Sequence, residues 1–105
     1  AGSSTSRDDG AGTTAGMVAY LEITDLDSGT ATVTIQESSD NGSSDAWVNV
    51  MVFSTVGYAS APTAERITSS GTVERYLRIT TTGTFSNLDF CVSTRRGTSQ
   101  DDVAF

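Results

Sequence analysis

Hydrophobic positions are densest between Trp47 and Phe53, where the sequence is Trp-Val-Asn-Val-Met-Val-Phe. Alternate residues of a β-strand point to opposite faces. One face of this segment would therefore carry its three valines, and the other Trp47, Met51 and Phe53. A strand in an ordinary antiparallel sheet buries one face and leaves the other in water. Because this segment is apolar on both faces, we expect a loop of the chain or a neighbouring subunit to cover the second one.

The two-residue period continues in five more segments, and none has a sustained helical period. These predicted strands are residues 17–24, 31–37, 64–68, 73–82 and 84–94. Residues 25–29, with two aspartates and a glycine, predict a turn. The spacing favours an antiparallel β-sandwich of about six to eight strands, jelly-roll or immunoglobulin-like. We divide the chain into an N-terminal arm or linker (1–16), a sandwich domain (17–95) and a C-terminal tail (96–105).

Asn41-Gly42 between alternating runs is a strong hairpin signal and predicts a two-residue turn, although a longer loop is the alternative. The apolar pairs formed in that register are Ile35–Val48, Val33–Val50 and Ala31–Val52. The expected core consists of Val33, Ile35, Val48, Val50, Val52, Leu77, Ile79, Leu88 and Phe90.

A second hairpin is predicted from two Glu-Arg pairs, at residues 65–66 and 74–75. If Ile67 faces Val73, each glutamate faces an arginine of the other strand, which stabilises antiparallel pairs. The alternative is that these strands pair elsewhere. The residues expected on the outer face, where a neighbouring subunit would contact them, are Arg66, Glu74, Tyr76 and Arg78.

Residues 1–16 hold almost only small and polar side chains, so they cannot bury enough surface to order themselves. We expect either a disordered tail or an arm that a neighbouring subunit orders.

The charged residues exclude several classes of function. Among 105 residues there is no lysine and no histidine, and the net charge is −7. Nucleic acid and anionic membranes are therefore not expected as partners. Histidine-dependent triads and Schiff-base chemistry are excluded, so we expect a protein that is not an enzyme and that has no cofactor. The single cysteine, Cys91, is expected to be a small packed residue.

Two further groups of residues have alternative interpretations. Asp25, Asp27, Asp40 and Asp45 supply oxygen atoms at short spacings that calcium favours, but turn formation explains them more simply, and we predict no metal site. The large apolar side chains Trp47, Met51, Phe53 and Tyr58 are candidates for core, for an assembly contact or for a sugar-binding platform.

Two resemblances add an expected function. Ser38-Ser39-Asp40-Asn41-Gly42, followed by Trp47, resembles the S-x-D-x-G-x-x-W hairpin of sialidase-like and carbohydrate-binding sandwich domains, with two extra residues before the tryptophan. Residues 8–94 resemble a β-sandwich domain of tailed-bacteriophage virion proteins. The segments that carry this likeness are Asp-Asp-Gly, Ala-Tyr-Leu-Glu-Ile-Thr, Ala-Thr-Val-Thr-Ile-Gln-Glu-Ser-Ser-Asp-Asn-Gly, Ala-Pro-Thr-Ala-Glu-Arg-Ile and Val-Glu-Arg-Tyr-Leu-Arg-Ile-Thr-Thr-Thr-Gly-Thr-Phe.

The second resemblance implies a structural protein of the virion, assembled in many copies on a capsid or tail. Its expected partners are capsid or tail proteins of the same particle and further copies of itself. The alternative, from the hairpin motif, is a carbohydrate-binding module for host attachment, with a glycan as its partner.

Overall fold

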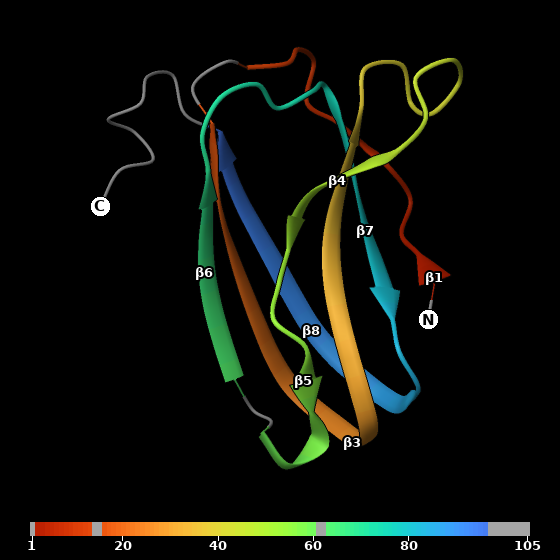
Figure 1. Ribbon diagram of the computed structural model, residues 1–105, viewed down its shortest axis with the longest axis vertical. Coiled ribbons are helices and arrows are strands. Elements are labelled where there is room, and N and C mark those ends of the chain that lie inside the picture. The colour runs from red at the N-terminus through yellow and green to blue at the C-terminus, as the bar shows by residue number, and fades with distance from the viewer. Residues whose placement is uncertain (1, 14–15, 61–62, 97–105) are drawn as a thin grey trace.

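β-Strands form nearly all of the regular structure in the computed structural model, which describes residues 2–13, 16–60 and 63–96 (Figure 1). The strands are β1 (Gly2–Ser3), β2 (Arg7–Asp8), β3 (Met17–Ser38), β4 (Val48–Val52), β5 (Val56–Gly57), β6 (Thr63–Ser69), β7 (Tyr76–Thr82) and β8 (Phe85–Arg96). The one helix in the described part is a 3₁₀ turn, η1 (Tyr58–Ser60). The predicted all-β class is confirmed, and every pairing of these strands is antiparallel.

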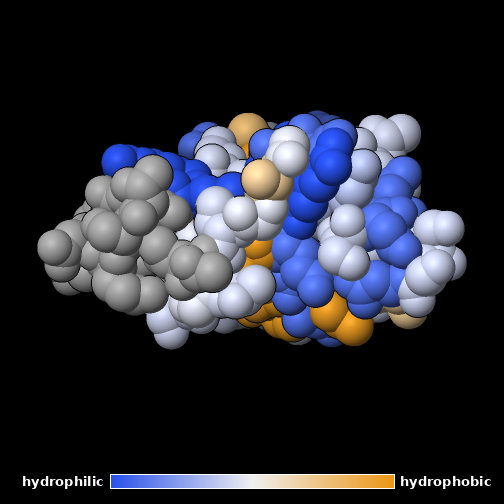
Figure 2. Space-filling view, turned by 90° about the horizontal axis from the view of Figure 1, so that it is seen from above, coloured by the Kyte–Doolittle hydropathy of each residue, from blue (hydrophilic) through white to orange (hydrophobic). Residues whose placement is uncertain are grey.

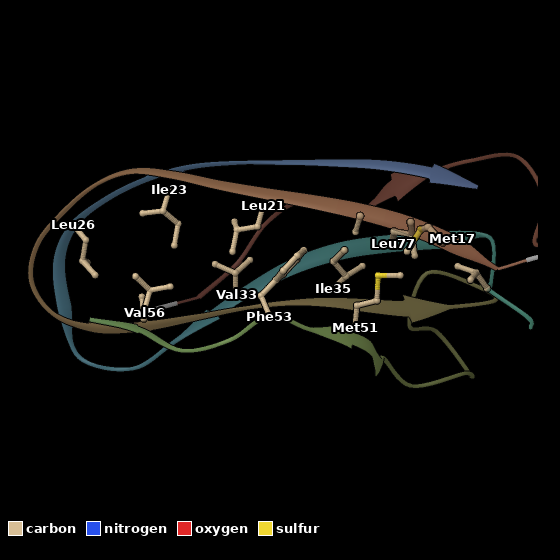
Figure 3. Packing of buried hydrophobic residues seen from close by; sticks show 13 residues of the cluster. Met17, Leu21, Ile23, Leu26, Val33, Ile35, Met51, Phe53, Val56 and Leu77 are labelled. Carbon is tan, nitrogen blue, oxygen red and sulfur yellow. The ribbon is translucent and has the colours of Figure 1, made fainter. Parts of the chain in front are cut away.

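Strand β3 organises the sheet because its 22 residues pair with five other strands. Its first limb, residues 17–29, pairs with β6 and β8. Its second limb, residues 30–38, pairs with β4, β5 and β7. Figure 3 shows the limbs as two layers joined where β3 bends, with the buried side chains between them. The sheet is therefore curled over its own core.

The turn predicted at residues 25–29 is wrong, because these residues continue β3. The pairing with β8 shifts between Ile23 and Asp25, which marks an irregularity of the β-bulge type. Gly29 has a φ of 82°, in the left-handed region that glycine adopts readily. Bulges and glycines bend a strand without ending it. The signals that predicted a turn therefore curl one continuous strand.

Gly29→Ala is expected to destabilise the protein by about 2 kcal/mol or more, since the left-handed region alone costs an L-residue roughly 1–2 kcal/mol. An added Cβ would also lie 1.9 Å from the main-chain oxygen of Thr84, so the backbone would have to shift. Gly57→Ala is the matched control, because no heavy atom lies within 4 Å of a Cβ built there. Urea denaturation compares the two variants, and equal losses would contradict the role of Gly29.

The core lies between the two limbs of β3. Its buried hydrophobic residues are Met17, Ala19, Leu21, Ile23, Leu26, Ala31, Val33, Ile35, Met51, Phe53, Val56, Val73 and Leu77. Among the expected members, Val33, Ile35 and Leu77 are buried, as predicted. Ile79, Leu88 and Phe90 are half-buried and pack against this cluster.

The predicted phase of β4 is wrong. Val48 and Val52 are 50% and 54% exposed, whereas Met51 and Phe53 are buried. Val50 is half-buried against the core and lies where the register with β3 shifts. The three valines therefore do not form the core face of this strand, and its outer valines stay uncovered within the chain.

The register explains this inversion. Strands β3 and β4 form the predicted hairpin, but Ile35 pairs with Met51 rather than with Val48. This displacement of three residues exchanges the buried and exposed faces at Met51 and Val52. On the other side of the register shift, Gln36 pairs with Asn49 and Glu37 with Val48, a displacement of two residues that keeps the predicted face. The loop is long because the carboxylate of Asp40 accepts hydrogen bonds from the main-chain N–H groups of Ser44 and Asp45. These bonds close residues 39–47 as a wide loop instead of a two-residue turn at Asn41-Gly42.

The second predicted hairpin does not exist. Strand β6 pairs with the first limb of β3 and β7 with the second, so these two strands belong to different layers. Glu65 instead accepts hydrogen bonds from the main-chain N–H and the hydroxyl group of Ser54. Arg75 forms an ion pair with Asp8 at 2.6 Å. The alternative, that the strands pair elsewhere, is the one found.

The N-terminal segment lies on β7 of the same chain, through Gly2 opposite Thr81 and Arg7 opposite Leu77. The expectation that only a neighbouring subunit could order it is wrong for the described residues. Main-chain bonds to β7 and charged contacts order the segment without a large apolar area. Of the predicted C-terminal tail, Arg96 alone is described, and residues 97–105 lie outside the described range.

Three charged residues fasten this segment to β8, and we call Arg7, Asp9 and Arg96 the Arg96 cluster. Both guanidinium groups donate to the Asp9 carboxylate, at 2.6 Å from Arg7 and 2.7 Å from Arg96. Arg96 also donates to the main-chain oxygens of Val73, at 2.8 Å, and Glu74. Burial raises the pKa of Asp9, but the two arginines outweigh burial and leave the pKa lowered. Asp9 is therefore a stable anion between two cations.

Candidate functional site

Four polar or aromatic side chains are joined on the outer face of β4, β3 and β7, and we call Trp47, Asn49, Gln36 and Arg78 the Gln36 array. Gln36 lies opposite Asn49 on one neighbour and opposite Arg78 on the other. Its amide donates to the Asn49 oxygen at 2.9 Å and accepts from Nε of Arg78 at 2.8 Å. The Arg78 guanidinium lies 4.7 Å from the centre of the Trp47 ring. These contacts hold long side chains in one arrangement before any partner binds.

Trp47 is less open than a sugar-binding platform requires. It is half-buried, with the guanidinium of Arg78 over its ring. Gly42 of the 39–47 loop lies close to the indole, since a Cβ built there would be 2.4 Å from Nε1. The ring therefore packs between the loop and β7.

The other predicted members of the platform lie elsewhere. Met51 and Phe53 are buried in the core, so they are neither sugar ligands nor assembly contacts. Tyr58 is 60% exposed, but it belongs to η1, at the opposite end of the molecule from the start of β4 (Figure 1). The four-residue platform inferred from the sequence is therefore not formed.

The predicted outer face of the second hairpin is also divided. Tyr76 and Arg78 lie two residues apart on β7, and Tyr76 is stacked by Arg75 at 5.0 Å. Arg66 is exposed on β6, in the other layer, opposite Tyr20.

Cys91, expected to be packed, is exposed on β8. The alternate residues of the same strand do face the core; they are Leu88, Phe90 and Val92. The prediction was therefore wrong only for the face of β8 that carries Cys91.

Glu74 was expected on a free outer face, but it lies beside the 39–47 loop. The Oε2 atom of Glu74 is buried and has no hydrogen-bond partner. Two ionised carboxylates have no proton to share, so Glu74 and Asp45 cannot bond to each other in that state. A proton on Glu74 allows a hydrogen bond to Asp45, which is the main reason that its pKa rises to about 7. Burial and the charges of Asp45, Glu37 and Asp40 raise the pKa further.

This arrangement predicts a pH dependence between pH 5 and 8. The pKa of Glu74 is higher in the folded chain, so its stabilisation is fully present below the ordinary pKa of 4.5 and is lost as the pH rises through about 7. The protein is therefore expected to have a lower Tm at pH 8 than at pH 5. Glu74→Gln should raise the Tm at pH 8 and flatten this dependence. Thermal unfolding at the two pH values measures it, and an unchanged slope in the variant would contradict the assignment.

The aspartates considered for calcium are used within the fold. The Asp40 carboxylate is occupied by main-chain N–H groups, and the bond from Ser44 contributes most to lowering its pKa. Asp25 and Asp27 both accept hydrogen bonds from the side-chain amide of Asn87. Within the described ranges, no group of three or more acidic or cysteine side chains is arranged to hold a metal ion.

Sequence reasoning missed the partners that build the Gln36 array. Gln36 and Asn49 are ordinary outward residues in the sequence, and only the register places them opposite each other. The Arg96 cluster also joins residues from both ends of the chain. Its one signal was Arg7-Asp8-Asp9, a charged group in an otherwise uncharged segment.

A comparison of the chain with protein-family models, with curated proteins and with solved structures gives no match. Among the described residues, no helix is long and apolar enough to cross a membrane.

Proposed function

We propose that this chain is a non-enzymatic structural protein of a tailed-bacteriophage virion. In this proposal it is a β-sandwich subunit, jelly-roll or immunoglobulin-like, that decorates or stabilises a capsid or tail through repeated contacts. The likeness of residues 8–94 to virion sandwich domains supplies the kind of particle. The curled two-layer arrangement is compatible with a sandwich, since both layers contribute to one core.

The observation that carries this proposal is the Gln36 array. Tryptophan, tyrosine and arginine are enriched at protein–protein contacts, and preorganised side chains lose less entropy on binding. Tyr76 continues the array along β7, and the exposed Val52 adds apolar surface on the same face of β4. The covered Trp47 ring disfavours the carbohydrate-binding alternative. The view from above is mainly hydrophilic, with small hydrophobic patches (Figure 2), as expected of a subunit that stays soluble before assembly.

The test is binding of the purified chain to tailed particles that lack it. Val52→Lys places a charge on the proposed contact at an exposed position, so folding should change little. It is expected to weaken co-sedimentation with the particles by about tenfold or more, as for a charge buried without a partner. Tyr58→Lys, exposed at the other end, is the matched control and should bind normally. Equal binding of both variants would reject this face, and failure of the unmodified chain to bind any particle would reject the function. Binding to glycans in place of particles would favour the alternative.

A further inference from the structure

Strand β8 lies at an edge of the first layer. In the part of the chain that the structure describes, it pairs with β3 alone. Figure 1 shows β6, the first limb of β3 and β8 side by side, with the other side of β8 turned toward β7 and β1. An unpaired strand edge presents main-chain donors and acceptors that can pair with another strand.

A groove of about 390 Å³ follows this edge, between β8 and the strands β1 and β7. The residues that line it are Gly2, Ser3, Ser4, Ile79, Thr81, Phe85, Leu88 and Phe90. Its four apolar side chains pack against the core but stay only half-buried; they are Ile79, Phe85, Leu88 and Phe90. This side of the curled sheet is fastened at one end by the Arg96 cluster and remains open along the groove. The opposite side is fastened by the bonds between Ser54 and Glu65.

Few features protect this edge. From residue 88 to residue 94, β8 contains no proline and no lysine, and its one charged residue is Asp89. Proteins usually block long edges with such residues, with bulges or with short strands. The contacts of Thr94 and Arg96 with the N-terminal segment are made by their side chains, so they use no main-chain group of β8. The edge is therefore free to accept a strand.

We propose that β8 pairs antiparallel with β8 of a second copy of this chain, about a two-fold axis at Val92. In this register Val92 faces Val92 of the second copy, and Phe90 faces its Thr94. Asp89 faces Arg95 of the second copy, and the reverse pair forms on the other side of the axis. Asp89 and Arg95 are exposed in the single chain, on the face of β8 that points away from the core.

Charge complementarity selects the second copy and the register. Opposed unlike charges stabilise an antiparallel pair and like charges destabilise it. An axis at Asp89 would place the two Asp89 carboxylates opposite each other. An axis at Phe90 or at Cys91 would leave Asp89 facing an uncharged residue. Only the axis at Val92 matches Asp89 with Arg95, and it does so twice.

The pairing would also bury more apolar surface. The first layers of the two copies would form one continuous sheet, with Leu88, Phe90 and Val92 of both copies on the same face. This inference goes beyond the proposed function, because it concerns a different surface and needs no particle. Failure of the dimer would leave the particle-binding proposal intact, and the reverse also holds.

The first test is the mass of the full chain in solution, measured by analytical ultracentrifugation over a range of concentrations. A concentration-dependent dimer is expected. Arg95→Asp should weaken it by about tenfold or more, because two attractive pairs become repulsive. The double variant Asp89→Arg with Arg95→Asp should restore it. A chain that stays monomeric at all concentrations, or a double variant no better than Arg95→Asp, would overturn the proposal.

The second test fixes the register by disulfide cross-linking. In the proposed pair, exposed Cys91 faces Ser93 of the second copy, so Ser93→Cys should cross-link efficiently under copper-catalysed air oxidation. Thr68→Cys is the matched control, because Thr68 is exposed on β6, at the opposite edge of the layer. Cross-linking of Ser93→Cys no faster than of Thr68→Cys would reject this register.

Discussion

Phe53→Ala is expected to destabilise the protein by about 3–5 kcal/mol, the usual loss when a buried phenylalanine becomes alanine. Phe53 is 1% exposed and is among the largest fully buried side chains. Figure 3 shows its ring extending from the layer of β4 toward the first limb of β3. The variant would lose apolar contacts with both layers and leave a cavity that the curled sheet cannot close without moving a limb.

Val52→Ala is the control, since it removes apolar groups from the neighbouring position of β4. Val52 is 54% exposed, so its loss should stay within about 0.5 kcal/mol, as is usual for surface substitutions. Urea denaturation of the unmodified protein and both variants gives the comparison. Similar losses in both would show that the core face of β4 is the valine face after all.

Arg96→Ala is expected to cost about 2–3 kcal/mol, below the loss of roughly 3–5 kcal/mol when one partner is removed from a fully buried ion pair, because this pair is only partly buried. The Arg96 side chain is 13% exposed and that of Asp9 is 16% exposed. The substitution would leave the Asp9 carboxylate with Arg7 alone and the main-chain oxygens of Val73 and Glu74 without this donor. A group that loses one of its donors in a partly buried site recovers less of its desolvation cost.

Arg95→Ala is the matched control, because Arg95 is the adjacent residue and is exposed. It should change the stability of the monomer by no more than about 0.5 kcal/mol. Amide exchange provides a second measurement. In Arg96→Ala, the main-chain N–H groups of Asp9 and Thr13, which bond to Arg75 and Val73, should exchange faster. Unchanged protection there would mean that the Arg96 cluster does not hold the N-terminal segment.

Both predictions concern contacts between residues far apart in the sequence, and both depend on the bend in β3. Phe53 is covered because the first limb folds back over the second. Arg96 reaches the N-terminal segment because β8 follows the first limb while β7, which holds that segment, follows the second. A substitution that disturbs this bend, such as Gly29→Ala, should therefore weaken both groups of contacts together.

The sequence by itself determined the all-β class and the core face of two strands, although it placed a turn within β3 and assigned the wrong core face to β4. Alternation at Ala31, Val33 and Ile35, and at Leu88, Phe90 and Val92, identified core-facing sides that the structure confirms. This succeeds because the side-chain period of a strand is local and follows from backbone geometry.

Only the tertiary structure decided which strands are neighbours and in what register they pair. Alternation is equally compatible with any partner whose apolar face is in phase. The Glu-Arg repeats therefore fit a hairpin of β6 with β7 as well as the observed arrangement, in which β6 and β7 each pair with β3. The loop that the hydrogen bonds of Asp40 close displaced the start of β4 by two residues, and the register shift beside Val50 made the displacement odd. Met51 and Phe53 are therefore buried in place of the valines. The Gln36 array and the Arg96 cluster follow from these pairings. Their members have no common local pattern. The Gln36 array forms because β4 and β7 both pair with the second limb of β3, and the Arg96 cluster forms because β3 bends at Gly29 instead of ending there.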